Sequence, residues 1–170
     1  LGCELDRRAA DDRIGRMTED ALDAVGDISD DAVMVDDDDD VRAALALLVG
    51  SVGLRVAGWK QPQEFIERFD RASVGAVVLD VRMPGASGLV VLEQLRAQGV
   101  DQPVIMLTGH GSAEMCRRAF KAGAADFLEK PVDDDALLEA LHAAVRAHVR
   151  SRERVAADRE RCLVDDRPLP

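Results

Sequence analysis

The stretch Ala32–Gly50, AVMVDDDDDVRAALALLVG, decides the fold of this chain. Four apolar residues run up to Asp36, and a continuous apolar run is typical of a strand that is buried on both faces. Five aspartates follow, and apolar residues at helical spacing come after them. The stretch therefore predicts a strand, a turn and a helix. Either Asp38 or Asp39 can cap that helix, because a helix N-terminus favours carboxylate acceptors and negative charge.

Outward from this stretch, the same alternation of strand and helix patterns recurs up to about residue 148. Strands are expected at 32–35, 54–57, 76–79, 104–107 and 126–128. Amphipathic helices are expected at 41–49, after Pro62, at 88–98, at 112–122 and after Pro131. Apolar strands that alternate with helices predict a parallel sheet with helices on both faces, which is a doubly wound α/β fold.

The two flanks of this regular region have a different composition. Residues 1–31 carry scattered apolar residues among Asp, Arg, Ala and Gly, which predicts a flexible N-terminal tail. Residues 150–170 are mostly polar and can continue the last helix as an exposed extension or serve as a linker. We therefore expect one domain over 32–149.

Composition excludes several classes of function. The 170 residues carry a net charge of −11, which disfavours nucleic-acid binding by this chain because phosphate would be repelled. Three cysteines without a CxxC pair argue against a disulfide framework or a zinc site. Neither a membrane-spanning run nor a signal peptide is evident, so we expect a cytoplasmic protein that does not bind a membrane.

Polar side chains stand where the predicted strands end. In an open parallel sheet, ligands bind at the carboxyl ends of the strands. The residues expected at that edge are three carboxylates, a hydroxyl and an ammonium: Asp36, Asp37, Asp80, Thr108 and Lys130.

Each of these residue types suits phosphoryl chemistry. Neighbouring carboxylates repel one another, and a hard divalent cation such as Mg²⁺ relieves that repulsion. A carboxylate such as Asp80 can attack phosphorus to form an aspartyl phosphate. Lys130 and Mg²⁺ would balance the charge on the transferred oxygens, and Thr108 can donate a hydrogen bond to one of them.

Four segments resemble the receiver domain of bacterial two-component response regulators: VMVDDDDDVRAAL, VVLDVRMPGASGL, IMLTGHGS and KAGAADFLEKP. The resemblance implies a flavodoxin-like sheet of five strands in the order 2-1-3-4-5. It also implies that Asp80 accepts a phosphoryl group from a sensor histidine kinase. Asp36, Asp37 and the backbone carbonyl of Arg82 would hold Mg²⁺ together with Asp80. A receiver is a signalling domain and not an enzyme, apart from catalysing its own phosphotransfer and dephosphorylation.

The same resemblance implies how the signal is read out. Thr108 and Phe127 would be the switch pair, and Lys130 would contact the phosphate. Gly109 stands where the family commonly has alanine, and its small size leaves the phosphate site open. Phosphorylation would reshape the surface of the helix at 112–122 and the strand at 126–128, through which homodimers often form in this family.

The TGHG and GAADFLEKP segments are most similar to the nitrogen-fixation-type regulators, which carry a C-terminal LuxR-type helix-turn-helix. Residues 150–170 would then lead towards an absent DNA-binding effector domain, and control of transcription would depend on that domain. A stand-alone receiver is the other interpretation.

Three rival functions fit the sequence less well. A haloacid-dehalogenase-type phosphatase needs a DxDx[T/V] motif, which Asp37, Asp39 and Val41 satisfy, but its nucleophile would lie one residue past the strand and a cap domain is lacking. A flavodoxin-like cofactor binder needs a phosphate loop that five aspartates would repel. A degenerate receiver used only for protein contacts is disfavoured because all the acceptor-site residue types are present.

Overall fold

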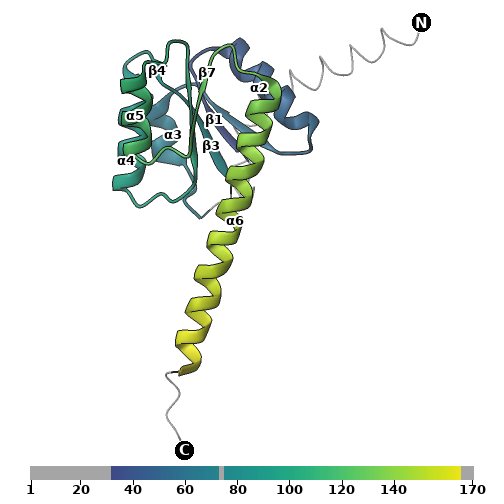
Figure 1. Cartoon of the computed structure of the whole chain (residues 1–170), viewed down its shortest axis with the longest axis vertical. Helices are drawn as coiled ribbons and strands as arrows, with labels where there is room; N and C mark the ends of the chain where they lie inside the picture. Colours follow the sequence, from purple (N-terminus) through teal and green to yellow (C-terminus); the bar gives the residue numbers. More distant parts are fainter. Residues whose placement is uncertain (1–31, 73–74, 166–170) are drawn as a thin grey trace, which may run out of the picture.

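The computed structural model describes residues 32–72 and 75–165, so the tail expected at 1–31 and the end of the chain from 166 lie outside the described residues. Five parallel strands form one sheet in the order β2-β1-β3-β6-β7 (Figure 1). They are β1 (Ala32–Val35), β2 (Val56–Trp59), β3 (Ala76–Asp80), β6 (Val104–Thr108) and β7 (Asp126–Glu129). Counted along the chain this order is 2-1-3-4-5, which confirms the predicted flavodoxin-like fold.

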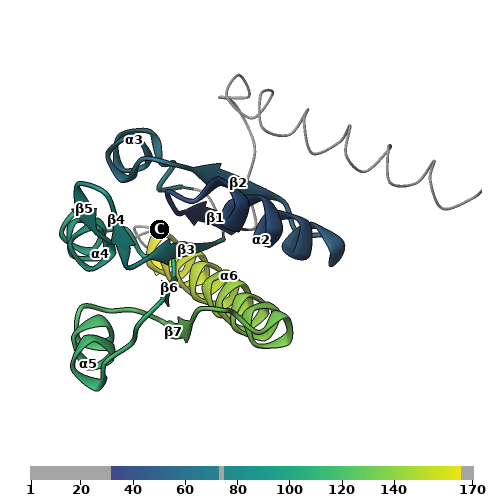
Figure 2. The same cartoon turned by 90° about the horizontal axis from the view of Figure 1, so that it is seen from above.

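Helices cover both faces of the sheet, as Figure 2 shows from above. They are α2 (Asp39–Ser51), α3 (Pro62–Arg68), α4 (Gly88–Ala97), α5 (Ala113–Lys121) and α6 (Asp134–Asp165). One core lies under α3, α4 and α5 and takes Val33 and Val77 from the strands. The other lies under α2 and α6 and takes Met34 and Val78. Neighbouring strand residues alternate between the two cores, so both faces of the sheet are apolar and buried.

Two local features differ from the sequence expectation. Strand β2 begins at Val56 and ends at Trp59, two residues later than expected, because its register pairs Ala32 with Val56 and Val35 with Trp59. Leu54 packs against the core under α2 and lies ahead of the strand. The loop after β3 contains a short antiparallel ribbon of β4 (Arg82–Met83) and β5 (Ala86–Ser87), where only a tight loop was expected.

The aspartate run is a turn and a helix start, as expected. Asp38 is the N-cap of α2, and its Oδ1 accepts hydrogen bonds from the amides of Asp40 at 2.9 Å and Val41 at 3.2 Å. Asp39 is the first residue of the helix and forms ion pairs with Arg42 and Lys60. Capping therefore uses Asp38, and Asp36 and Asp37 remain available at the end of β1.

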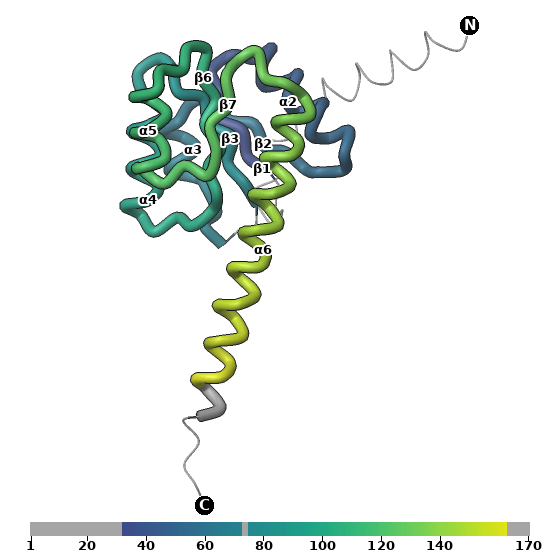
Figure 3. The backbone as a smooth tube through the Cα atoms, in the orientation of Figure 1, coloured from purple at the N-terminus to yellow at the C-terminus, as the bar shows by residue number. Residues whose placement is uncertain are grey.

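Helix α6 continues beyond the domain body. Figures 1 and 3 show its C-terminal half projecting away from the sheet. His148 is buried at 4% exposure, and Arg152 donates a hydrogen bond to the carbonyl of Ala72 at 3.1 Å. Residues 153–162 are exposed. Of the two forms expected for the segment after residue 149, the structure has a helix as far as Asp165. No helix within the described ranges has the length and apolarity needed to cross a membrane.

Candidate functional site

The predicted polar residues meet at the carboxyl edge of the sheet. Asp36 follows β1 directly and Asp80 ends β3, and these two side chains are buried, with exposures of 1% and 5%. Asp37 is half-buried in the turn before α2. Each of the three residues offers a carboxylate oxygen, and these oxygens all lie within 4.8 Å of one another. Parallel strands end at one edge, so residues distant in sequence converge there, as the sequence predicted.

Lys130 is brought to the same point by the strand next to β6. Its Nζ lies 2.7 Å from Oδ2 of Asp36 and 3.0 Å from Oδ1 of Asp80. Its backbone amide donates a 2.7 Å hydrogen bond to the carbonyl of Thr108, which fixes where the side chain leaves β7. Within residues 32–72 and 75–165, no other basic side chain forms an ion pair with Asp36 or Asp80.

Lys130 offsets only part of the cost of burying the Asp80 carboxylate next to two other carboxylates. Burial raises the pKa of Asp80, the Lys130 ammonium opposes that rise, and the carboxylates of Asp36 and Asp37 add to it. Burial works against the charge of Lys130, but its bonds to Asp36 and Asp80 outweigh that effect and raise its pKa above the usual 10.5. Three carboxylates and one ammonium leave a formal charge of −2 at the site, which a divalent cation would balance.

The raised pKa of Lys130 predicts a pH dependence of stability. A lysine whose pKa is raised by folding stabilises the protein fully below its unfolded pKa, and this contribution is lost as pH rises through the folded pKa. Urea unfolding of the metal-free chain from about pH 8 to about pH 11.5 should therefore show a steeper loss above the usual lysine pKa than in Lys130→Met. Parallel curves for the two proteins would contradict the effect.

The predicted switch residues lie beside this cluster. Thr108 ends β6 and is buried at 1% exposure, and its Oγ1 accepts a hydrogen bond from the amide of His110 at 3.3 Å. Phe127 is half-buried on β7. Gly111 separates the two: a Cβ placed there would lie 3.1 Å from Cε1 of Phe127 and 3.2 Å from Cγ2 of Thr108. At Gly109 a Cβ would meet nothing within 4 Å, so an alanine would fit there as well.

Two glycines at the site, Gly88 and Gly111, are not recognisable as functional from the sequence alone. Gly88 begins α4 directly behind β3, and a Cβ there would collide with the backbone carbonyl oxygen of Asp80 and lie 2.9 Å from its carbonyl carbon. Gly111 holds open the space next to Phe127. In the sequence, Gly88 is visible only as part of the Ser-Gly pair at the start of α4, and Gly111 only as the second glycine of TGHG. Neither pattern indicates which neighbouring group requires a glycine.

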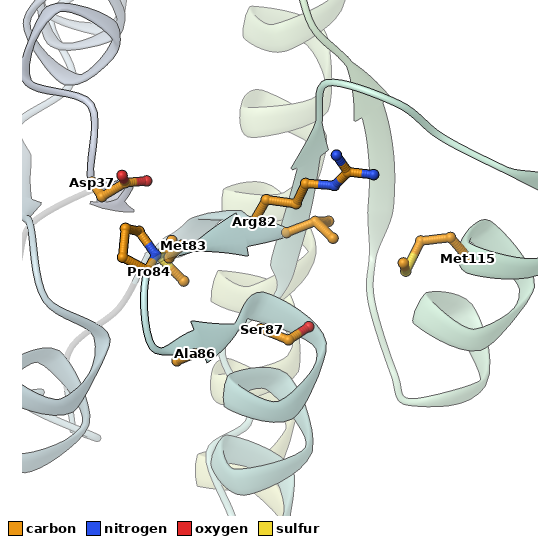
Figure 4. Close-up of a pocket in the computed structure, with 8 residues that line it drawn as sticks. Asp37, Arg82, Met83, Pro84, Ala86, Ser87 and Met115 are labelled. Atoms are coloured by element: carbon orange, nitrogen blue, oxygen red, sulfur yellow. The ribbon is translucent and has the colours of Figure 1, made fainter.

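Arg82 and the loop after β3 form one wall of a shallow hollow beside the carboxylates. Figure 4 shows the Arg82 side chain extending away from Asp37. The hollow has a volume of about 510 Å³ and a largely apolar lining that comprises Asp37, Val81, Arg82, Met83, Pro84, Ala86, Ser87 and Met115. The role of the Arg82 carbonyl as a metal ligand stays a prediction.

The phosphatase interpretation is not supported by the geometry. Its motif would make Asp37 the nucleophile and Asp39 the second acid. Asp39 instead faces Arg42 and Lys60 and is largely exposed, with a side-chain exposure of 66%. The buried carboxylate held by Lys130 on the central strand is Asp80, so the phosphorus-attacking group of that motif is not at the centre of the site.

Comparison with known proteins gives the family of this fold and site. The response regulator receiver domain family matches residues 32–142, about two-thirds of the chain. The chain is 46% identical over 112 residues to the transcriptional regulatory protein FixJ of Azorhizobium caulinodans, and this match covers 66% of the chain and 53% of FixJ. It therefore spans about half the length of that relative. The similarity agrees with the subgroup predicted from TGHG and GAADFLEKP.

Solved structures with the same architecture belong to the same family. The response regulator StyR is 37% identical with a TM-score of 0.73, over 81% of this chain and 70% of StyR. The beryllofluoride-activated NtrC4 receiver domain dimer is 28% identical with a TM-score of 0.65, over 69% of this chain and 97% of that receiver domain chain. By fold, by the residues at the edge of its sheet and by sequence, this chain belongs to the response regulator receiver domain family.

Proposed function

We propose that this chain accepts a phosphoryl group on Asp80 from a sensor histidine kinase and passes the signal on as a change of its surface. The observation that carries the proposal is the placement of Asp80: its buried carboxylate lies within 4.8 Å of Asp36 and Asp37 and pairs with Lys130 at 3.0 Å. The Asp80 carboxylate is therefore next to the Lys130 ammonium and next to two further carboxylates that could bind a metal ion with it.

The donor set fits Mg²⁺. Carboxylate oxygens are the hard ligands that this ion prefers, and Asp36, Asp37 and Asp80 can provide them, with the Arg82 carbonyl as a further ligand. Receiver domains as a family bind Mg²⁺ at such an acidic pocket. When bound, the ion would neutralise the carboxylates and the oxygens of the phosphoryl group during transfer.

The residues of the chain then have separate roles in the transfer. Lys130 holds Oδ1 of Asp80 and so orients the attacking carboxylate. An oxygen of Asp80 forms the new bond to phosphorus, and the bond to the imidazole nitrogen of the kinase breaks, with the electron pair leaving on that nitrogen. The Lys130 ammonium balances charge on the transferred oxygens, so the receiver catalyses its own phosphotransfer.

The readout would run through Thr108 and Phe127. The Thr108 hydroxyl can donate a hydrogen bond to a phosphoryl oxygen, and the Phe127 ring on β7 would follow into the space that the threonine leaves. Because Phe127 lies beside α5, this change would reshape the α5–β7 face, and we propose that face for homodimerisation. The likeness to the NtrC4 receiver domain dimer supports a dimer.

We propose that residues 32–149 are the receiver and that the helix beyond 149 leads to an effector domain outside this chain. The family match over 32–142 and the helix that runs on to Asp165 support this division. Likeness to the transcriptional regulator FixJ supports transcription control as the output, with DNA bound by the effector domain. The acidic composition and the lack of a CxxC pair in the sequence support a cytoplasmic location.

A substitution at Gly111 should perturb the switch pair selectively. The added methyl of Gly111→Ala lies close enough to Phe127 and Thr108 that the ring must shift by a few tenths of an ångström. We expect the ring resonances of Phe127 to move in NMR spectra and the stability to fall by about 1 kcal/mol. The matched control is Gly109→Ala, which meets no atom. Equal effects of the two variants would contradict this packing role.

The requirement for a divalent ion tests the proposed function. The chain should gain one acid-labile phosphoryl group from acetyl phosphate with Mg²⁺, seen as an increase in intact mass, and almost none with EDTA. Asp37→Asn should raise the Mg²⁺ concentration needed for half-maximal uptake. Uptake that is equally fast in Mg²⁺ and in EDTA would rule out the metal-assisted mechanism.

A further inference from the structure

The backbone carbonyl of Asp36 is held by the side chain of Arg42, a residue that has no role in the proposed phosphotransfer. The amide, the carbonyl and both carboxylate oxygens of Asp36 all form hydrogen bonds. The amide of Asp36 donates a hydrogen bond to the Trp59 carbonyl at 3.2 Å. Its Oδ1 accepts a hydrogen bond from the Asp38 amide at 2.9 Å, and its Oδ2 accepts one from Nζ of Lys130 at 2.7 Å. Its carbonyl accepts a 2.6 Å hydrogen bond from Nη1 of Arg42.

Arg42 donates to the Asp36 carbonyl at the point where the β1–β2 ladder no longer provides a backbone amide for it. The ladder between β1 and β2 ends with the pair Val35 and Trp59, so the amide of β2 that would come next is not paired with the Asp36 carbonyl. The Arg42 side chain is only 18% exposed. It passes over β2 at Gly58, where a Cβ would lie 3.8 Å from its Cδ. The guanidinium therefore takes over the role of a backbone donor at the end of β1.

The carbonyl held by Arg42 belongs to the peptide that leads into Asp37. A peptide unit is planar, so a fixed carbonyl also fixes the direction in which the chain enters the next residue. No described residue donates a hydrogen bond to the Asp37 carboxylate, and none forms an ion pair with it. The orientation of Asp37 towards Asp36 and Asp80 thus depends on its backbone, and the backbone depends on Arg42.

We propose that Arg42 is a positioning residue for the metal acids: by holding the peptide between Asp36 and Asp37, it keeps Asp37 directed at the metal position. The second arm of the guanidinium bonds Asp39, which Lys60 also contacts at 3.1 Å, and this fork anchors Arg42 to the start of α2. This inference rests on the proposed function, because it assumes that the three carboxylates bind a divalent ion.

A positioning role and simple electrostatics predict opposite changes in metal affinity when Arg42 is removed. Arg42 is a positive charge next to a cation site, so by charge alone its removal would strengthen the binding of a divalent ion. A positioning role predicts the reverse. Loss of a residue that orients a metal ligand typically weakens metal binding about 10- to 100-fold.

The test is Mn²⁺ binding, followed by the electron paramagnetic resonance signal of the free ion. This readout is independent of phosphotransfer. Arg42→Gln should bind Mn²⁺ at least about tenfold more weakly than the native chain. The matched control is Lys60→Gln, which removes a charge that also contacts Asp39 but leaves the Asp36 carbonyl held, and its affinity should be unchanged or tighter. Circular dichroism at the same temperature checks that each variant is folded.

Arg42→Lys keeps the positive charge but lacks the planar guanidinium with its two donor arms. It is the variant to test if Arg42→Gln fails to fold. It should bind Mn²⁺ several-fold more weakly, whereas charge alone predicts no change. Unchanged or tighter binding in Arg42→Gln, unchanged binding in Arg42→Lys, or an equal loss in Lys60→Gln would each overturn the role of Arg42. If the native chain itself binds no Mn²⁺, the proposed metal site fails, which is a separate outcome.

Discussion

Lys130→Met is expected to slow phosphoryl uptake from acetyl phosphate by about 100- to 1,000-fold, the usual effect of removing one group that stabilises charge in a transition state. The reason is the position of the ammonium, 2.7 Å from Asp36 and 3.0 Å from Asp80. Without it the attacking carboxylate loses its orientation, and the transferred oxygens lose a balancing charge. Methionine retains the length and apolar stem of the lysine, so packing changes little.

The measurement is the rate of acid-labile phosphate incorporation at saturating Mg²⁺. Lys121→Met is the matched control, because Lys121 is exposed at the end of α5 and should leave the rate unchanged. A Lys130→Met variant that reacts as fast as the native chain would show that the lysine has no part in the transfer.

Gly88→Ala is expected to destabilise the domain by about 3 kcal/mol or more, a large share of the stability of a small domain. The new methyl would collide with the Asp80 carbonyl oxygen and lie 3.0 Å from Cα of Val81. These are backbone atoms at the end of β3 and just after it, and they cannot rotate aside. The amide of Gly88 also donates a 2.9 Å hydrogen bond to the Val81 carbonyl, so displacing the helix start breaks this bond too.

Urea unfolding gives the change in free energy, and Gly50→Ala provides the comparison. Gly50 lies within α2, and a Cβ there meets nothing within 4 Å. The helical preference of alanine should make this variant more stable by about 0.5 to 1 kcal/mol. A Gly88→Ala protein as stable as the native chain would mean that α4 can move away from β3 at little cost.

Much of the fold could be predicted because the strands are continuous apolar runs that each end in a polar residue. That pattern located β1, β3 and β6 and placed Asp36, Asp80 and Thr108 at one edge of the sheet. The edge strand β2 was expected two residues too early, because it is half-exposed and its limits depend on pairing with β1 and not on its own apolar pattern.

The parts of the site that could not be predicted depend on contacts between distant backbone segments. Nothing in the residues around Gly88 or Gly111 indicates that one lies against the Asp80 carbonyl and the other against the Phe127 ring. Arg42 is likewise an ordinary helix residue in the sequence, and its bond to the Asp36 carbonyl becomes evident only once β2 is seen to end at Trp59.

Asp80 is the residue that we propose to receive the phosphoryl group. The most direct measurement compares the native chain with Asp80→Asn after incubation with acetyl phosphate and Mg²⁺, using intact mass and peptide mapping after trapping of the acyl phosphate. The native chain should carry one acid-labile phosphoryl group on the peptide that contains Asp80, and the folded variant should carry none. Equal labelling of the two proteins, or a label mapped to another residue, would contradict the claim.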